Sequence, residues 1–452
     1  MRKNDIINLN IDAMSSEGSG IGRYDSVAVF VPNSAVGDSI TAKVLKVKSN
    51  CAFAKIEEII TPSPDRIKPD CDVFLKCGGC VYRHISYDAE LDIKQRRVED
   101  AVRRIGKVDL SANTIVSNKK ITGYRNKAQY PVAQSGEVGF FANHSHRIIP
   151  CENCKLQPHE FSAIANIFKE WMHKSGNTVY DEGTSIGLVR HLYIRKAFAT
   201  GQIMVCLVVN GNSVKYAEDF VSDLQKELGD DLKTVVLNIN KEKTNVILSD
   251  KCVNLYGDGY IYDILCGVKV RISPLSFYQV NRDMAELLYK KVAEYADIKG
   301  KTLLDLYCGA GTIGLSMADK AENVIGVEII HQAVEDAIFN AKNNGVKNAR
   351  FLCADAAEAA KTLHEENIKP DVVVVDPPRK GCSADLISTI TDSFSPERVV
   401  YVSCDAATMA RDIKMFTDKN YQLKEYTPFD LFPRTVHTEC VALLQRASVD
   451  TN

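Results

Sequence analysis

The chain has 452 residues, of which 45% are hydrophobic and 25% are charged, as in ordinary soluble globular proteins. No apolar run is long enough to cross a bilayer, and the first residues lack the apolar core of a secretory signal, so we expect a cytoplasmic protein without membrane contact. The 14 cysteines are therefore expected to be reduced, and to serve metal binding or catalysis rather than disulfides.

The length predicts about three domains. The net charge is −2, but residues 66–147 contain 15 Lys and Arg against 9 Asp and Glu, a local charge of +6. Such a concentration of positive charge is typical of a nucleic-acid-binding region, although a solvated helix face would also explain part of it.

Residues 1–62 alternate apolar and polar positions between glycine-containing turns, which predicts a small antiparallel β-barrel. Lys and Arg balance Asp and Glu there, so charge alone does not favour RNA binding over a purely structural barrel. The proline-rich run TPSPDRIKPD then predicts a linker.

The linker leads to three thiols in an irregular segment, Cys71, Cys77 and Cys80. This spacing is typical of a bound metal centre, and zinc is the general alternative. A fourth ligand must come from elsewhere, and Cys151 and Cys154 are the candidates.

Residues 63–270 predict an α+β central domain. A helix with a basic outer face is expected after Cys80, followed by the strand-like segment YRNKAQY. Alternation there places Arg125 and Lys127 on one face, and we expect Tyr124 and Tyr130 to stack on bases. Surface ion pairs would explain either cation as well.

Residues 271–452 predict a Rossmann-like α/β domain. The segment KTLLDLYCGAGTIG contains a strand, an acid and a glycine turn that opens a helix. The turn fits a dinucleotide-binding pattern, but Asp305 would repel a pyrophosphate and tolerate the sulfonium amino acid S-adenosylmethionine (SAM). Glu328 ends the next predicted strand, where an acid can accept hydrogen bonds from ribose hydroxyls, and Asp355 ends a third strand.

Two Val-rich runs, DVVVV and RVVYV, end at Asp376 and Cys404. Such runs predict parallel strands buried on both faces, whose carboxyl ends meet at one ligand-binding edge. Asp376 and Cys404 are therefore expected to face one pocket, unless Cys404 is an inert packing thiol.

The segments SPLSFYQVN, DLYCGAGTIGL, VVVVDPPRKG, VVYVSCD and HTECVALLQR, in this order, resemble the RNA uracil-C5 methyltransferase family. The resemblance covers nearly the whole chain and is greatest to the iron–sulfur 23S ribosomal RNA branch, which implies that the N-terminal barrel is an RNA-binding TRAM domain of OB-like fold.

The resemblance implies a role for each motif residue. Cys404 is the nucleophile, Glu439 is the general base, Asp376 holds the uracil edge or the cofactor, and Arg379 neutralises developing negative charge. The residues implied to bind SAM are Gln279, Asp305, Tyr307, Gly309, Gly311, Thr312, Glu328, Asp355 and Asp376. Phe277, Arg125 and Lys127 are implied to contact the RNA.

In the branch that the chain resembles, a C-x5-C-x2-C group and one distant cysteine hold a structural [4Fe–4S] cluster. The implied ligands are Cys71, Cys77, Cys80 and, by its distance from the following Leu-Gln pair, Cys154 rather than Cys151.

The predicted protein is a monomeric enzyme that transfers a methyl group from SAM to carbon 5 of one flipped-out uridine in 23S ribosomal RNA, through a covalent bond between the cysteine and carbon 6. Three alternatives remain: a transfer-RNA uracil-54 methyltransferase, whose usual branch lacks the barrel and the cluster, an NAD-dependent oxidoreductase, and a catalytically inactive RNA-binding module.

Overall fold

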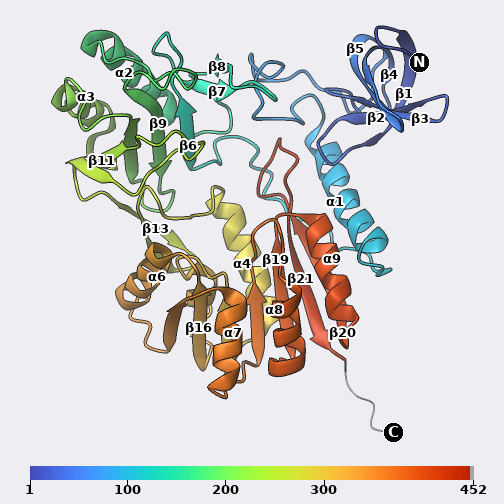
Figure 1. Cartoon of the computed structure of the whole chain (residues 1–452), viewed down its shortest axis with the longest axis vertical. Coiled ribbons are helices and arrows are strands. Elements are labelled where there is room, and N and C mark those ends of the chain that lie inside the picture. The colour runs from blue at the N-terminus through green and yellow to red at the C-terminus, as the bar shows by residue number, and fades with distance from the viewer. Residues whose placement is uncertain (448–452) are drawn as a thin grey trace. The chain divides into compact units, whose positions relative to one another are not determined.

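The computed structural model describes residues 1–447 (Figure 1). The chain divides into two compact units, each made of several segments. Unit 1 comprises Met1–Arg97, Phe141–Ile149 and Phe432–His437, and unit 2 contains the remainder. Among the helices of the described part, none combines the length and the apolar character needed to cross a membrane.

Unit 1 begins with a closed five-stranded barrel in the order β1-β2-β3-β5-β4. Side chains on its strands alternate between inside and outside, and Ile7, Leu9 and Ile11 fill the interior, as period-2 patterning predicts. The predicted small antiparallel barrel is confirmed, with one parallel pair between β3 and β5. The strands are β1 Ile6–Met14, β2 Gly20–Tyr24, β3 Val27–Val31, β4 Ser39–Val47 and β5 Cys51–Thr61.

Helix α1 (Tyr87–Arg104) begins in unit 1 with a buried charge cluster. The Glu90 carboxylate accepts hydrogen bonds from Lys94 Nζ (2.7 Å) and the Arg434 backbone N–H (2.7 Å). Both Glu90 and Lys94 are fully buried. Buried charges require such pairing, so the segment Phe432–His437 depends on this helix for its conformation.

The central part of unit 2 contains a five-stranded sheet in the order β12-β11-β10-β9-β6. Helices α2 (Glu160–Ser175) and α3 (Ala217–Leu228) cover one face of it through an apolar core. The strands are β6 Lys127–Pro131, β9 Val189–Lys196, β10 Ile203–Val209, β11 Leu232–Ile239 and β12 Cys252–Tyr256. The remaining short elements are β7 Gly139–Phe141, β8 Ile148–Pro150, and the 3-10 turn Gly229–Asp231.

The C-terminal part of unit 2 is a seven-stranded sheet in the order β17-β16-β15-β18-β19-β21-β20. The first five strands in that order are parallel, and β21 runs antiparallel to β19 and β20. Their bounds are β15 Thr302–Leu306, β16 Asn323–Glu328, β17 Ala349–Cys353, β18 Val372–Val375, β19 Arg398–Ser403, β20 Tyr421–Phe429 and β21 Glu439–Arg446. The predicted α/β domain is confirmed.

Helices cover this sheet on both faces, with α8 and α9 in front and α4 behind in Figure 1. The hairpin β13 (Ile261–Leu265) and β14 (Val268–Ile272) precedes α4. The helices are α4 Arg282–Ala296, α5 Thr312–Leu315, α6 His331–Asn343, α7 Ala356–Glu365, α8 Ala384–Ser388 with the π-turn Thr389–Phe394, and α9 Ala406–Thr417. Coverage of both faces explains the continuous Val runs of β18 and β19.

Candidate active site

Three predicted catalytic residues lie at one edge of the seven-stranded sheet. Asp376 follows β18 and Cys404 follows β19, and these strands are parallel neighbours. Ser403 pairs with Cys440 of the antiparallel strand β21. The register therefore places Glu439, the first residue of β21, beside Cys404, and the structure brings the acid and the thiol together.

The pKa values of Glu439 and Cys404 at this edge depend on the charges of neighbouring side chains. Burial, and then the charge of Asp376, raises the pKa of Glu439 to about 8, while Arg379 acts in the opposite direction. Burial raises the pKa of Asp376 to about 6. Burial, followed by the carboxylates of Glu439 and Asp376, raises the pKa of Cys404 to about 11, and Arg379 opposes this too. Neighbouring groups with strongly perturbed pKa values are typical of a catalytic site.

The glycine turn after β15 surrounds a buried carboxylate. Asp305 Oδ2 accepts a hydrogen bond from Gly314 N–H (2.9 Å), and Oδ1 is buried without a partner among the described residues. Burial raises the pKa of Asp305 to about 7. An orphaned buried carboxylate oxygen fits a cationic ligand group such as the ammonium of SAM, which would restore its lost hydrogen bond.

The rest of the turn is shaped by close packing. Gly311 has φ of +77°, and a Cβ there would lie 2.9 Å from the Phe351 ring, so only glycine is tolerated. Thr312 opens α5 and shares a hydrogen bond (3.0 Å) with the Tyr289 hydroxyl of α4. The Glu328 carboxylate accepts from Gly309 N–H (3.1 Å). These contacts hold the turn in a fixed conformation at the sheet edge, where the sequence predicts that SAM binds.

Two other residues predicted to bind the cofactor have clear local roles. Tyr307 follows β15 directly with a φ of +66°, a strained conformation of the sort found near ligands. Asp355 caps α7, because its Oδ1 accepts from Ala357 N–H (2.9 Å). That bond alone would explain Asp355 as a helix cap, so its contact with SAM remains a prediction.

The segment that contains Phe277 and Gln279 has alternating burial. Phe277 is 71% exposed and Gln279 is partly exposed, whereas Tyr278 between them and Ser276 before them are buried. Asn126 holds the segment through a side-chain hydrogen bond to the Gln279 carbonyl (2.9 Å). A large aromatic ring kept in solvent on an anchored backbone is suited to stacking on a base.

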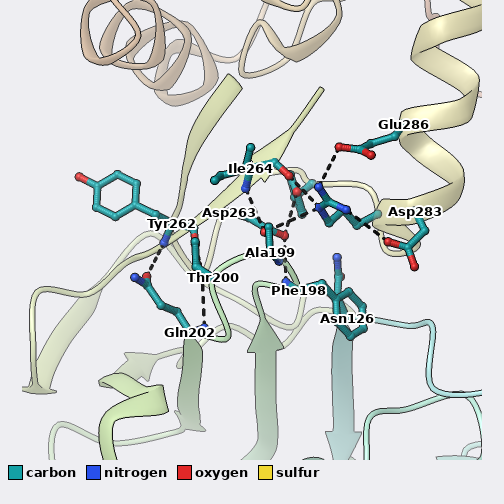
Figure 2. A network of polar contacts seen from close by, with 12 residues as sticks. Asn126, Phe198, Ala199, Thr200, Gln202, Tyr262, Asp263, Ile264, Asp283 and Glu286 are labelled. Atoms are coloured by element: carbon teal, nitrogen blue, oxygen red, sulfur yellow. Dashed lines mark hydrogen bonds and ion pairs between the residues drawn. The ribbon is translucent and has the colours of Figure 1, made fainter. Parts of the chain in front are cut away.

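Asp263 anchors this segment further, and sequence reasoning missed it. It is fully buried and accepts from the backbone N–H groups of Phe198 (3.1 Å) and Ala199 (2.8 Å). Its Oδ2 also accepts from the Tyr278 hydroxyl (3.0 Å). Figure 2 shows Asp263 between the loop at Ala199 and the helix that carries Asp283 and Glu286. The signal was an isolated acid in the apolar strand IYDIL.

The alternation predicted for YRNKAQY is present, but the tyrosines do not face solvent. Arg125 and Lys127 are partly exposed. Tyr124 and Tyr130 are each only 1% exposed, and Tyr130 packs against Phe140 in the core under α2. The expectation that these tyrosines stack on bases is therefore wrong, because Tyr130 lies in the apolar core on the inward face of β6 and Tyr124 is buried just before that strand.

The predicted metal ligands lie in two units. Cys71, Cys77 and Cys80 share one loop of unit 1, where Cys77 Sγ accepts from Gly79 N–H (3.3 Å) and Cys80 Sγ from Arg83 Nε (3.4 Å). Cys154 belongs to unit 2. Donors aimed at sulfur fit thiolate ligands. However, residues 1–447 include no group of three or more His, Cys, Asp or Glu arranged to hold a metal, so the structure does not show the predicted cluster.

Comparison with protein families gives two matches. The family model described as tRNA (Uracil-5-)-methyltransferase matches residues 86–447, and the TRAM domain model matches residues 2–56. Both agree with the positions of the catalytic edge and the barrel.

Curated relatives match along nearly the whole chain. "Uncharacterized RNA methyltransferase" proteins of Clostridium tetani and Halalkalibacterium halodurans are each 40% identical, covering 98% of this chain and 97% and 98% of theirs. A crystal structure of Pyrococcus abyssi tRNA (uracil-54, C5)-methyltransferase with S-adenosyl-L-homocysteine superposes with a TM-score of 0.80 at 27% identity. It covers 97% of this chain and 99% of its own.

Proposed function

Because the chain belongs to the tRNA (Uracil-5-)-methyltransferase family, with an N-terminal TRAM domain, and is a SAM-dependent RNA uracil-C5 methyltransferase, we propose that it modifies one uridine of 23S ribosomal RNA by covalent catalysis. The observation that carries the mechanism is the register of β19 and β21, which puts Cys404 and Glu439 at the same edge as Asp376.

The reaction begins with the Cys404 thiol. As the thiol gives its proton to solvent water, the sulfur attacks carbon 6 of the uracil, a carbon–sulfur bond forms, and the electron pair of the C5–C6 double bond moves into an enolate. Carbon 5 then becomes nucleophilic. SAM, when bound at the turn around Asp305, supplies the electrophilic methyl group of its sulfonium.

The product of methyl transfer still carries a hydrogen on carbon 5. Glu439 removes this proton, the C5–C6 double bond re-forms, and the carbon–sulfur bond to Cys404 breaks. A carboxylate whose pKa is raised to about 8 by burial is matched to proton abstraction near neutral pH. The exposed guanidinium of Arg379 balances the negative charge that the enolate oxygen develops.

The raised pKa of Cys404 implies that the thiolate forms only as the substrate docks. Burial and two neighbouring carboxyl groups disfavour the anion in the free enzyme. Deprotonation coupled to attack keeps the negative charge off the sulfur and transfers it to the uracil oxygens. The target base must first leave its stack, at a cost of a few kcal/mol. Stacking of the base on the exposed Phe277 ring would offset part of that cost.

The four thiols Cys71, Cys77, Cys80 and Cys154 support the ribosomal assignment, and we propose that they hold a structural [4Fe–4S] cluster. The hydrogen bonds to Cys77 and Cys80 are the kind that stabilise thiolate ligands. No step of the reaction involves the cluster, because four thiolates leave its irons no open position.

A second substrate is transfer RNA at uracil 54. The Pyrococcus abyssi enzyme of that description covers 97% of this chain. The length of the structural match therefore does not distinguish a ribosomal RNA substrate from a transfer RNA substrate. The dehydrogenase alternative is wrong, since the family match spans the glycine turn on which it was based.

Nucleoside mass spectrometry of a deletion strain tests the substrate. We expect 5-methyluridine to disappear from one position of 23S ribosomal RNA, and to return with the wild-type gene but not with Cys404→Ala. Loss from transfer RNA alone would replace the ribosomal assignment with the second candidate. Unchanged 5-methyluridine in both RNAs would contradict the proposed substrates.

A further inference from the structure

Helix α6 carries two buried polar side chains, Asp336 and Asn340, about one helical turn apart. Residues at this spacing lie on the same face of a helix. The helix begins at His331, shortly after Glu328, and packs against the hairpin strand β14, as its place beside the β13 hairpin in Figure 1 shows. Asp336 is 2% exposed and Asn340 is fully buried. Buried polar side chains are kept for the hydrogen bonds that they form, and these two bond to different segments of the proposed site.

Asp336 bonds to the loop that carries Phe277. Its Oδ2 accepts a hydrogen bond from the Ser276 hydroxyl (2.9 Å), and Ser276 immediately precedes Phe277. Its Oδ1 accepts from the Arg271 guanidinium of β14 (2.9 Å), which balances the charge of the carboxylate. Ser273 and Ser276 also exchange hydrogen bonds between each backbone N–H and the hydroxyl oxygen of the other (3.0 and 3.2 Å). The loop is therefore closed on itself and bonded to α6.

Asn340 bonds to the glycine turn after β15. Its Nδ2 donates to the carbonyl of Ala310 (3.2 Å), the residue immediately before Gly311. Packing acts at the same place, because a Cβ on Gly311 would lie only 3.2 Å from the Ala337 methyl group of α6. The same helix therefore holds both the turn and the loop.

We propose that Asp336 and Asn340 are positioning residues, which hold the turn and the Phe277 loop at one separation through α6 and thereby couple the binding of SAM to the binding of RNA. The inference rests on the proposed function, in which SAM binds at the turn around Asp305 and the target base stacks on Phe277. Methyl transfer requires the sulfonium methyl to contact carbon 5, and a misplacement of about 1 Å can slow a reaction about a hundredfold.

The coupling follows from the shared helix. Whichever ligand binds first immobilises α6 and both segments, so the second ligand loses less conformational entropy when it orders its own segment. Coupling between two binding sites is reciprocal, so RNA must tighten the binding of the cofactor by the same factor as the cofactor tightens the binding of RNA. We expect a factor of about ten, which is typical of coupled sites.

Two substitutions each remove one end of this link. Ser276→Ala removes the hydroxyl that bonds to Asp336 and leaves the ion pair of Asp336 with Arg271 in place. Asn340→Asp removes the N–H donor to the turn and keeps the oxygen that accepts from the Arg271 backbone N–H (3.0 Å). Because the two ends act in series, the double variant should lose no more coupling than either single variant.

Asn344→Asp is the matched control, since it makes the same change one turn further along α6. The Asn344 side chain bonds to Lys269 of β14 and to the Asn340 carbonyl of its own helix. The five full-length proteins, each holding its metal complement, are titrated by calorimetry with S-adenosyl-L-homocysteine, which has no methyl group to donate. Each titration is made with and without a short single-stranded RNA that contains one uridine. Methyl transfer from SAM to the same RNA is measured in a single turnover at saturating concentrations.

The RNA should tighten the binding of S-adenosyl-L-homocysteine about tenfold in the wild type and in Asn344→Asp, and by less than about twofold in the other three variants. Methyl transfer in those three should slow by about tenfold to a hundredfold. Ser276→Ala is sufficient for the test if Asn340→Asp does not fold.

A defect that is only structural would weaken both titrations equally and leave their ratio at about ten, which would overturn the link. Losses of coupling that multiply in the double variant would overturn it as well. If the wild type methylates RNA but shows no coupling, the link fails and the proposed function stands. If the wild type shows the coupling but methylates no uridine in ribosomal or transfer RNA, the link holds and the proposed function fails.

Discussion

The small thiolate fraction expected for Cys404 can be measured through its rate of alkylation. With a pKa of about 11, about one part in a thousand of this thiol is thiolate at pH 8, against about a quarter for an ordinary cysteine with a pKa of about 8.5. Alkylation by iodoacetamide follows the thiolate fraction. In the native enzyme without RNA, Cys404 should therefore react about two-hundredfold more slowly than in the unfolded chain.

Two substitutions should move this rate in opposite directions. Asp376→Asn removes a negative charge near the sulfur and should speed alkylation of Cys404 several-fold, whereas Arg379→Gln removes the opposing cation and should slow it. The assay is peptide-resolved mass spectrometry of alkylated protein against pH, with guanidinium-unfolded protein as the reference. Both variants should leave the Cys404 thiol partly exposed. A change in its solvent access alone would therefore not make alkylation faster in one variant and slower in the other. Native Cys404 reacting as fast as in the unfolded chain would refute the electrostatic account.

Four further outcomes are expected. Anaerobically purified protein should contain iron and be brown. The Cys154→Ser variant should lose the colour, whereas the Cys151→Ser variant should keep it. Stoichiometric zinc without iron in elemental analysis would exclude the cluster. The Glu439→Gln variant should accumulate a methylated protein–RNA adduct that resists denaturation and is visible on gels. The adduct should require SAM and should be absent from the double variant with Cys404→Ala. Normal turnover by the Glu439→Gln variant would exclude Glu439 as the base. Wild-type methylation should rise with pH through about 8 as Glu439 loses its proton. Glu328→Ala should weaken SAM binding by about 1.5–3 kcal/mol in calorimetry, and an unchanged affinity would exclude Glu328 from the site.

Much of the catalytic edge was predictable from strand patterns. The Val runs before Asp376 and Cys404 specify parallel buried strands, and the ends of such strands meet. Glu439 was different, since a single acid in a strand is usually solvated. The family resemblance implied a role for Glu439, but strand patterns alone did not. Its place beside Cys404 follows from the antiparallel register of β21 with β19, in which Cys440 pairs with Ser403, and local patterns do not encode such a long-range pairing.

Long-range packing also explains the sequence predictions that failed or were not made. Tyr130 has the spacing of an RNA contact, but the same alternation points it into the core. Glu90 and Lys94 have the spacing of a solvated i,i+4 pair. They are fully buried because Arg434, 344 residues after Glu90, completes their cluster. Asp263 likewise acquires its role from backbone donors in a distant loop.

The most direct test of the central claim is the fate of the hydrogen on carbon 5. RNA labelled with tritium at carbon 5 of uridine is incubated with the enzyme and SAM that carries a carbon-14 methyl group. Each methyl transferred to carbon 5 must displace one hydrogen, which Glu439 passes to water. The account predicts equal molar amounts of tritium released and carbon-14 incorporated, and neither with Cys404→Ala. Incorporation of methyl groups without release of tritium would contradict it, because the methyl group would then be on another atom.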